Sequence, residues 1–323
     1  MKTLKTGVAL AFALIITTAA LAKEPIKIGF SDWPGWVAWQ IAKDKGMFEK
    51  QGVEVNLIWF TNYTDSVNAL AAGKLDANCE AWSDVIQSVS EGAKLRVVLV
   101  NDNSAGNDAV VAKPEFNSIK DLKGKQVATE KGTVEHMLLL SALARNGMGE
   151  NSVKYINLPV DAAAAAFLAG KVDAVAVWQP WIGQLEREAK GKVLFTSKEM
   201  PGLIPDQLVF QESVVSVRSE EIQKIVATWF DVVDFIKNHE DEAVAVMAKV
   251  DAAKPEDYKA FLPGTKFFDL SANLEAFQAG NSDKSLVGSG RKISSFLQAK
   301  EVIKTIPDIA TILEPKFVNA LKK

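Results

Sequence analysis

Short apolar runs alternate with amphipathic stretches over the first two thirds of the chain. Stretches with apolar residues every three or four positions predict helices near 36–45 and 66–72, which end at Gly46 and Gly73. Strands separated by helices are typical of an open α/β sheet. Runs of about four to eight mostly apolar residues predict the strands, at 26–30, 54–60, 75–82, 96–102 and 108–113.

The same pattern then starts again. Strands are predicted at 126–129, 153–159 and 171–178, with a helix at 133–146. The stretch DSVNALAAGKLDANCEAW (65–82) resembles DAAAAAFLAGKVDAVAVW (161–178). Each has a helix start, a glycine stop and a strand that ends in tryptophan. The repeat therefore predicts two α/β lobes built on one plan, each a mostly parallel sheet flanked by helices.

The last third of the chain is helical in pattern. Apolar residues recur every three or four positions, so these helices should cover a lobe, with Trp229 in their buried stripe. The stretch VGSGR (287–291) lacks the spacing of a nucleophile elbow and is interpreted as a flexible turn. Helices are predicted at 219–239, 240–250, 254–262, 272–280 and 292–304.

The pattern predicts how the chain divides. Residues 23–111 and 209–323 form lobe 1, and residues 112–208 form lobe 2. The chain should cross between the lobes near 110–114 and again near 207–210. Two crossings are typical of a hinge.

Residues 1–22 have the pattern of a secretory signal peptide. Lys2 and Lys5 precede an apolar run at 7–16, and Ala20 and Ala22 occupy the −3 and −1 positions of a small-residue cleavage site. An N-terminal anchor is the alternative, but the run is short for a membrane span. We expect a periplasmic protein cleaved after Ala22. Removing two lysines and no acid takes the net charge from −3 to −5.

The composition excludes several classes of function. A mildly acidic, evenly mixed chain gives no reason to expect nucleic acid as a partner. Cys79 is the only cysteine, so no internal disulfide can form, and it should be a buried strand residue. The two histidines, His136 and His239, are far apart and do not form a zinc motif. We expect no metal, no cofactor, no catalytic residue and a monomer.

Ligands of open α/β sheets bind beyond the carboxyl ends of the strands. The segments at those ends are rich in acids and tryptophan and contain no arginine and one lysine, Lys131, which favours a small cation or a flat hydrogen-bonding ligand over an anion. Asp32 could instead cap a helix, and Trp36, at helical spacing from Trp39, could be core. The candidate ligand-binding residues are Asp32, Trp33, Trp36, Tyr63, Glu80, Trp82, Asp108, Glu130, Thr133 and Trp178.

Five stretches together resemble the periplasmic solute-binding proteins of ABC importers, in the nitrate, sulfonate and taurine branch. They are GFSDWPGWVAWQIAKDKGMFEKQGVEVNLIWF, ALAAGKLDANCEAWSD, SIKDLKGKQVATEKGTVEHMLLLSAL, DAAAAAFLAGKVDAVAVWQPW and IPDIATILEPKFV. The forms SDWPGWVAW and VNDNSAGNDAVVAK resemble a subgroup of which some members accompany urea- or guanidine-processing enzymes. The resemblance implies two lobes, a small ligand closed between them and a membrane permease as partner.

The sequence predicts a binding protein without catalysis. Guanidine, urea or an amine is the favoured ligand, sulfonates such as taurine together with nitrate come second, and pyrimidine-type thiamine precursors come third. The alternative from another class is an enzyme on the same fold, similar to thiamine-pyrimidine synthases, but the cysteine-rich motif of those enzymes is missing. A sensor subunit that presents ligand to a receptor kinase would use the same cleft.

Overall fold

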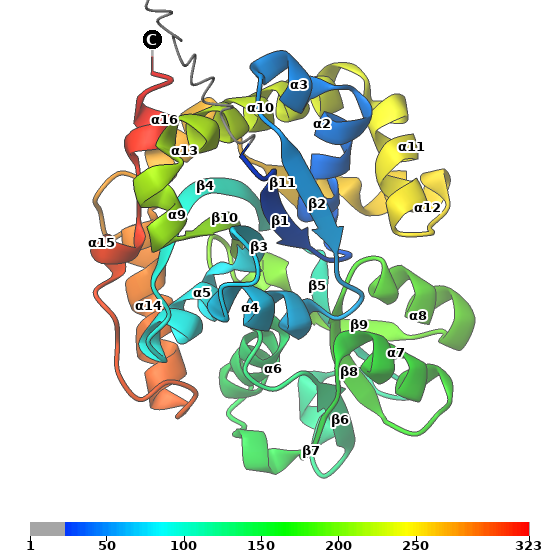
Figure 1. Cartoon of the computed structure of the whole chain (residues 1–323). Helices are drawn as coiled ribbons and strands as arrows, with labels where there is room; N and C mark the ends of the chain where they lie inside the picture. The colour runs from blue at the N-terminus through cyan, green and yellow to red at the C-terminus, as the bar shows by residue number, and fades with distance from the viewer. Residues whose placement is uncertain (1–22, 323) are drawn as a thin grey trace, which may run out of the picture.

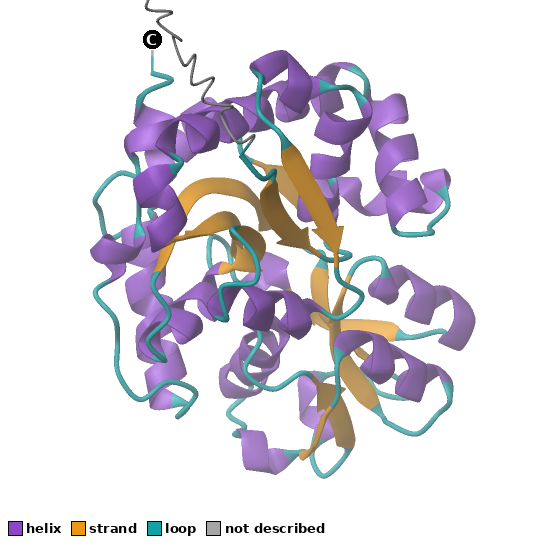
Figure 2. Cartoon of the chain, viewed as in Figure 1, coloured by secondary structure: helices purple, strands orange, loops and turns teal. Residues whose placement is uncertain are grey.

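The computed structural model describes residues 23–322, so the predicted signal peptide lies outside the described residues. Two separate sheets form the centres of two lobes (Figures 1 and 2). The first sheet has the order β11 (Thr265–Phe267), β4 (Leu95–Ser104), β10 (Pro205–Gln211), β3 (Ala77–Ala81), β1 (Ile26–Phe30) and β2 (Val55–Trp59). The second has the order β7 (Lys154–Asn157), β6 (Gln126–Thr129), β8 (Ala174–Trp178), β5 (Asp108–Ala112) and β9 (Lys192–Thr196).

Both sheets are mixed rather than mostly parallel as predicted, because β10 and β5 each pair antiparallel with both neighbours, but each has a parallel part that fixes where a ligand can bind. In the first sheet β1 is parallel to β2 and β3, and in the second β6 is parallel to β7 and β8. The strands β3, β5 and β8 are buried along their whole length, as expected for sheets covered on both faces. The carboxyl ends of β1, β3 and β8 carry the segments in which the sequence predicts the site.

The predicted lobe boundaries at 111/112 and 208/209 fall inside strands. All of β5 pairs in the second sheet, antiparallel to β8 and β9, and all of β10 pairs in the first, antiparallel to β3 and β4. The chain therefore changes sheet before Asp108 and again before Pro205. The local pattern could not show this, because both strands are almost uniformly buried and fit either sheet.

Helices cover both sheets. The predicted helix at 36–45 is broken into two short helices, which a third follows from Met47, and the predicted strand at 75–82 ends early because a further helix, α5, begins at Trp82. The helices of the first lobe's N-terminal half are α1 (Pro34–Val37), α2 (Trp39–Asp44), α3 (Met47–Gln51), α4 (Tyr63–Ala71) and α5 (Trp82–Ser90). Those of the second lobe are α6 (Val134–Arg145), α7 (Val160–Leu168) and α8 (Trp181–Ala189).

The last third of the chain is helical and packs on the first lobe, as predicted (Figure 1). Helix α10 lies against α2 and α3, and Trp229 within it is fully buried. The stretch 287–291 is not a flexible turn, because it lies in a buried part of α14. These helices are α9 (Glu212–Val217), α10 (Ser219–Asn238), α11 (Glu240–Val250), α12 (Pro255–Phe261), α13 (Leu270–Ala276), α14 (Leu286–Ala299), α15 (Ile309–Ile312) and α16 (Lys316–Asn319).

The internal repeat has a structural counterpart. Its first copy is α4 followed by β3, and its second is α7 followed by β8. Gly73 and Gly170 follow the two helices with φ of 71° and 70°, a left-handed conformation that a side chain would strain. Among residues 23–322, no helix is long and apolar enough to cross a bilayer.

Candidate functional site

Four aromatic rings form a continuous wall where the lobes meet. Trp33 and Trp36 lie 6.4 Å apart between ring centroids, Trp36 and Tyr63 lie 5.1 Å apart, and Tyr63 meets Trp178 edge-on at 5.8 Å. The first three rings belong to the first lobe and Trp178 ends β8 of the second, and all four are buried. The sequence predicted these four residues as site residues, and the fold brings them together.

Asp32 joins the two lobes directly. Its Oδ1 accepts a hydrogen bond from Trp178 Nε1 at 3.0 Å, and its Oδ2 accepts one from Trp181 Nε1 at 2.7 Å. Desolvation raises the pKa of Asp32 to about 6, although both hydrogen bonds act in the opposite direction. Asp32 does not cap the following helix, because α1 has Trp33 at its N-cap and no side-chain cap.

Replacing Asp32 by alanine should favour the open form. The change leaves two indole N–H groups of the second lobe without their acceptor, and each hydrogen bond to a charged group contributes about 1.5–3 kcal/mol. Small-angle scattering of the ligand-free protein should give a larger radius of gyration than wild type. Asp44→Ala, at an exposed site bonded only to Gln40, is the control. An unchanged radius for Asp32→Ala would show that this contact does not hold the lobes together.

Two carboxylates of the first lobe stand beside the aromatic wall. Glu80 lies in β3 and accepts a hydrogen bond at Oε1 from Asn78, while its Oε2 has no partner among the described residues. Asp84, in the first turn of α5, accepts one from Tyr63 Oη at 2.8 Å. Desolvation by burial raises the pKa of Glu80 to about 8 and that of Asp84 to about 7.

A pair of carboxyls lies next to Trp33. Asp102 in β4 and Asp206 in β10 are opposite each other in the antiparallel register and lie within hydrogen-bonding reach. Trp33 Nε1 donates to Asp102 at 3.1 Å, and Asp206 Oδ2 has no partner among residues 23–322. Both carboxyls are almost completely buried, and this burial raises both pKa values well above their ordinary range.

The second lobe adds Asp108 and Glu135. Asp108 begins β5 directly opposite Trp178, and Glu135 lies in the first turn of α6 within hydrogen-bonding reach of Asp108. Both oxygens of Glu135 and Oδ2 of Asp108 lack a partner among other described groups. Desolvation raises the pKa of Asp108 to about 6 and that of Glu135 well above its ordinary value. We call this set the inner carboxyls: Glu80, Asp84, Asp102, Asp108, Glu135 and Asp206.

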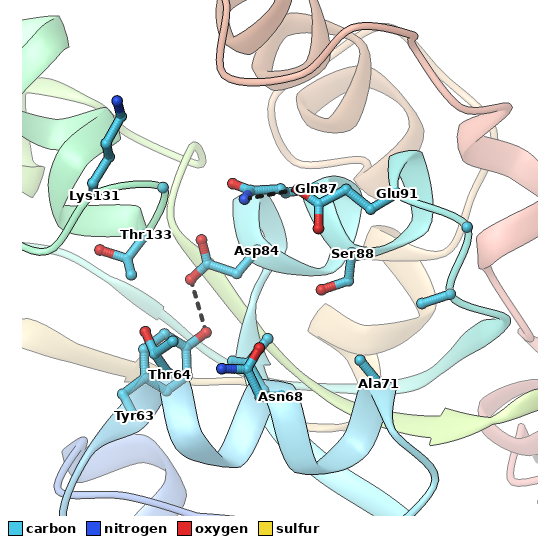
Figure 3. A pocket seen from close by; sticks show the side chains of 14 residues that line it. Tyr63, Thr64, Asn68, Ala71, Asp84, Gln87, Ser88, Glu91, Lys131 and Thr133 are labelled. Carbon is cyan, nitrogen blue, oxygen red and sulfur yellow. Dashed lines mark hydrogen bonds between the residues drawn. The ribbon is translucent and has the colours of Figure 1, made fainter.

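The seam between the lobes has three cavities along it. A cavity of about 410 Å³ lies between α4, α5 and residues 131–133, and Figure 3 shows Tyr63 and Asp84 joined across its floor. Another, of about 590 Å³, is lined by Asp32, Trp181 and Asp251 among others. A cavity of only about 10 Å³ lies beside Asp32, Tyr63 and Trp178. That volume is about one water molecule, so a ligand can enter there only when the lobes separate.

The remaining predicted residues have different surroundings. Glu130 lines the smallest cavity, and Thr133 lines the cavity of about 410 Å³ and donates to the Glu130 carbonyl. Trp82 lies outside the site, because its ring turns toward α14 and its Nε1 donates to the Leu286 carbonyl at 3.1 Å. The sequence prediction of Trp82 as a ligand contact is therefore not supported by its position.

Four of the inner carboxyls were absent from the predicted site: Asp84, Asp102, Glu135 and Asp206. All four lie in or beside the segments that come after predicted strands. The signal that could have found them is an acid surrounded by apolar residues in a buried element, as in LVND and VEHMLLL.

Comparison with known proteins identifies the family. The model of the NMT1-like family matches residues 19–252. The chain belongs to the NMT1-like family. A Brucella abortus chain named as a binding protein (BAB2_1146) is 30% identical over 252 residues, which are 76% of this chain and 78% of that one.

One further relative and one solved structure of the same fold carry more specific names. The taurine-binding periplasmic protein of Escherichia coli is 29% identical over 162 residues, half of each chain. The alkanesulfonate-binding protein SsuA of Xanthomonas axonopodis, bound to MOPS, has a TM-score of 0.78 at 19% identity and covers 91% of this chain and all of its own. This NMT1-like protein thus has the two-lobe fold of periplasmic binding proteins of the nitrate, sulfonate and taurine type, as the sequence predicted.

Proposed function

We propose that this NMT1-like protein is the solute-binding component of an ABC importer and captures a small cationic nitrogen compound, such as guanidinium or an alkylammonium ion, between its lobes. The observation that carries the proposal is the set of inner carboxyls beside an aromatic wall. No lysine, arginine or histidine of residues 23–322 forms an ion pair with any of them. Aromatic faces and carboxylates are the groups that attract an organic cation.

The second candidate is a sulfonate such as taurine, or nitrate, which the names of the relatives favour. The N-terminus of α6 is the position in the cleft where backbone N–H groups could hold an anion. Here Asp84 Oδ2 faces the Val134 N–H at 3.4 Å, and Glu135 adds a second acid in the same turn. Asp84 therefore already accepts the N–H that an anion would need at this position, and any ionised fraction of Asp84 would repel an anion there, so the site is better suited to a cation.

An enzyme on the same fold is the third candidate. The single thiol, Cys79, lies in β3 with no exposed surface, and desolvation raises its pKa well above the ordinary value. A thiol that stays protonated and buried cannot act as a nucleophile. The pocket residues therefore support binding rather than covalent chemistry.

A thermal-shift screen of the mature protein tests the proposal. Millimolar guanidinium chloride and methylammonium chloride should raise the melting temperature at pH 8, whereas taurine, nitrate and sodium chloride at equal ionic strength should not. Neutral urea is included to separate shape from charge. Stabilisation by taurine or nitrate alone would show that the ligand is an anion and that the proposal is wrong.

A further inference from the structure

The inner carboxyls have no countercharge from the protein. All six come from buried positions, with exposed fractions between 0% and 5%. A carboxylate in such surroundings without a cationic partner becomes neutral by binding a proton, because burying an unpaired charge costs too much free energy. Protons are therefore the groups that neutralise this site when no cation is bound.

The geometry shows where two of these protons are held. Asp102 and Asp206 face each other in the first lobe, and Asp108 and Glu135 do so in the second. Two carboxyls in hydrogen-bonding contact must share a proton, because two acceptors cannot bond to each other. Each pair therefore has one carboxyl that donates and one that accepts.

The same residues also carry the free acceptor atoms of the site. These are Glu80 Oε2, Asp108 Oδ2, Asp206 Oδ2 and the Glu135 oxygens, each buried and, apart from the shared proton of its own pair, without a partner among residues 23–322. A ligand with N–H donors could bond to them only where the oxygen is not already protonated. Capture of a cation and binding of a proton thus compete for the same atoms.

We propose that this site exchanges protons for its ligand: each captured cation displaces at least one proton from the inner carboxyls. The inference rests on the proposed function, because it requires a cationic ligand. Charge is conserved in the exchange, since the cation replaces the displaced proton as the counterion and the proton passes to solvent. Cation binding should then strengthen as pH rises.

The other titratable groups that face these carboxyls do not alter the direction. Tyr63 and Cys79 are neutral, and burial raises the pKa of each further. Glu130 and Asp32 lie at the edge of the site, and desolvation raises their pKa values too. Facing groups from α4, β3, β6 and β1 are therefore acids or neutral. Lys131 lines the same cavity as Asp84, but its side chain points away from Asp84, so it does not neutralise that carboxyl (Figure 3).

The sign of the pH effect is set by burial. Glu80, Asp84 and Asp108 have pKa values raised to about 8, 7 and 6, whereas ordinary carboxyls titrate near 4. Below pH 4 these groups are protonated in both the folded and unfolded protein, so their full contribution to stability is present. As pH rises above about 4, the unfolded chain releases protons that the folded protein retains, so the ligand-free protein loses stability until the pH passes the folded pKa values of about 6 to 8.

The test measures protons directly. A pH-stat titration of the mature protein with guanidinium chloride at pH 7, without buffer, should release about one proton or more per bound ion. For one proton, the Kd should fall about tenfold per pH unit between pH 6 and 7 and level off above pH 8. In urea unfolding, the midpoint of the ligand-free protein should fall over the same range.

Two variants make the test specific. Asp206→Asn removes the need for a shared proton in the first pair, so proton release should drop and the pH dependence of Kd should flatten. Glu135→Gln makes the same change in the second pair. If Asp206→Asn does not fold, Glu135→Gln takes its place in the test. Asp241→Asn, with a side chain 88% exposed, should behave as wild type.

Each outcome decides between the two proposals. Guanidinium or methylammonium binding with no proton release and a constant Kd overturns the exchange and leaves the cationic ligand in place. Failure of both cations to bind between pH 6 and 9 overturns the proposed function and the exchange with it. Binding of taurine with proton uptake, tighter at acidic pH, also overturns both.

Discussion

Glu80→Gln should weaken guanidinium binding at pH 8 by about tenfold to a hundredfold. A hydrogen bond to a charged group contributes about 1.5–3 kcal/mol, and the change removes the charge while keeping the size of the side chain. Glu80 Oε2 is the free acceptor lost from the first lobe. Isothermal titration calorimetry against wild type would measure the ratio of dissociation constants.

The same substitution should not destabilise the fold. A neutral amide avoids the cost of ionising a buried carboxyl, so the urea midpoint of Glu80→Gln at pH 8 should equal or exceed that of wild type. Glu115→Gln, at an exposed position after β5, is the matched control and should change neither quantity. If Glu80→Gln binds guanidinium as tightly as wild type, Glu80 does not contact the ligand.

Glu80 also shows which part of the candidate site could be predicted from the local sequence pattern. In β3, ANCEA, every residue is buried, so an acid there contradicts the environment of its strand. Such a conflict between residue type and burial is expected mainly at functional sites. The sequence alone could therefore place Glu80 among the candidates, together with the aromatic residues that end neighbouring strands.

The pairing of the inner carboxyls could not be predicted in the same way. Asp102 and Asp206 meet because β10 returns to the first sheet and inserts between β3 and β4. That insertion depends on tertiary packing, since the local pattern of β10 fits either lobe. Likewise, Glu135 reaches Asp108 only because α6 packs against β5.

The repeat predicted equivalent roles for Trp82 and Trp178, and the structure separates them. Trp178 is the last residue of β8, opposite Asp108 in the register, and its ring meets Tyr63 of the other lobe. Trp82 is the first residue of α5, which begins directly where β3 ends. The two tryptophan rings therefore point toward different parts of the structure although the repeats are similar in sequence, because the chain continues differently after each strand.

Trp82→Ala should lower the free energy of unfolding by about 3–5 kcal/mol, the cost of truncating a large buried aromatic side chain. Trp82 is fully buried and bonded to the Leu286 carbonyl. A Cβ added at Gly290 would lie 3.0 Å from Trp82 Nε1 and 2.8 Å from Ile309 Cγ2, so ring and helix are tightly packed. Urea unfolding at pH 6 would measure the loss.

Measuring both stability and guanidinium binding, with Trp59→Ala as the control, shows whether Trp82 packs the fold or contacts the ligand. Trp59 is 40% exposed and meets Phe30 edge-on, so Trp59→Ala should cost about 1 kcal/mol or less. Below its own melting transition, Trp82→Ala should bind guanidinium within about threefold of wild type, because no cavity of the seam is lined by Trp82 among the described residues. If Trp82→Ala loses guanidinium binding and keeps its stability, Trp82 contacts the ligand and the prediction is wrong. Lost stability with retained binding would show that the tryptophan at the end of the first repeat holds α14 against the first lobe.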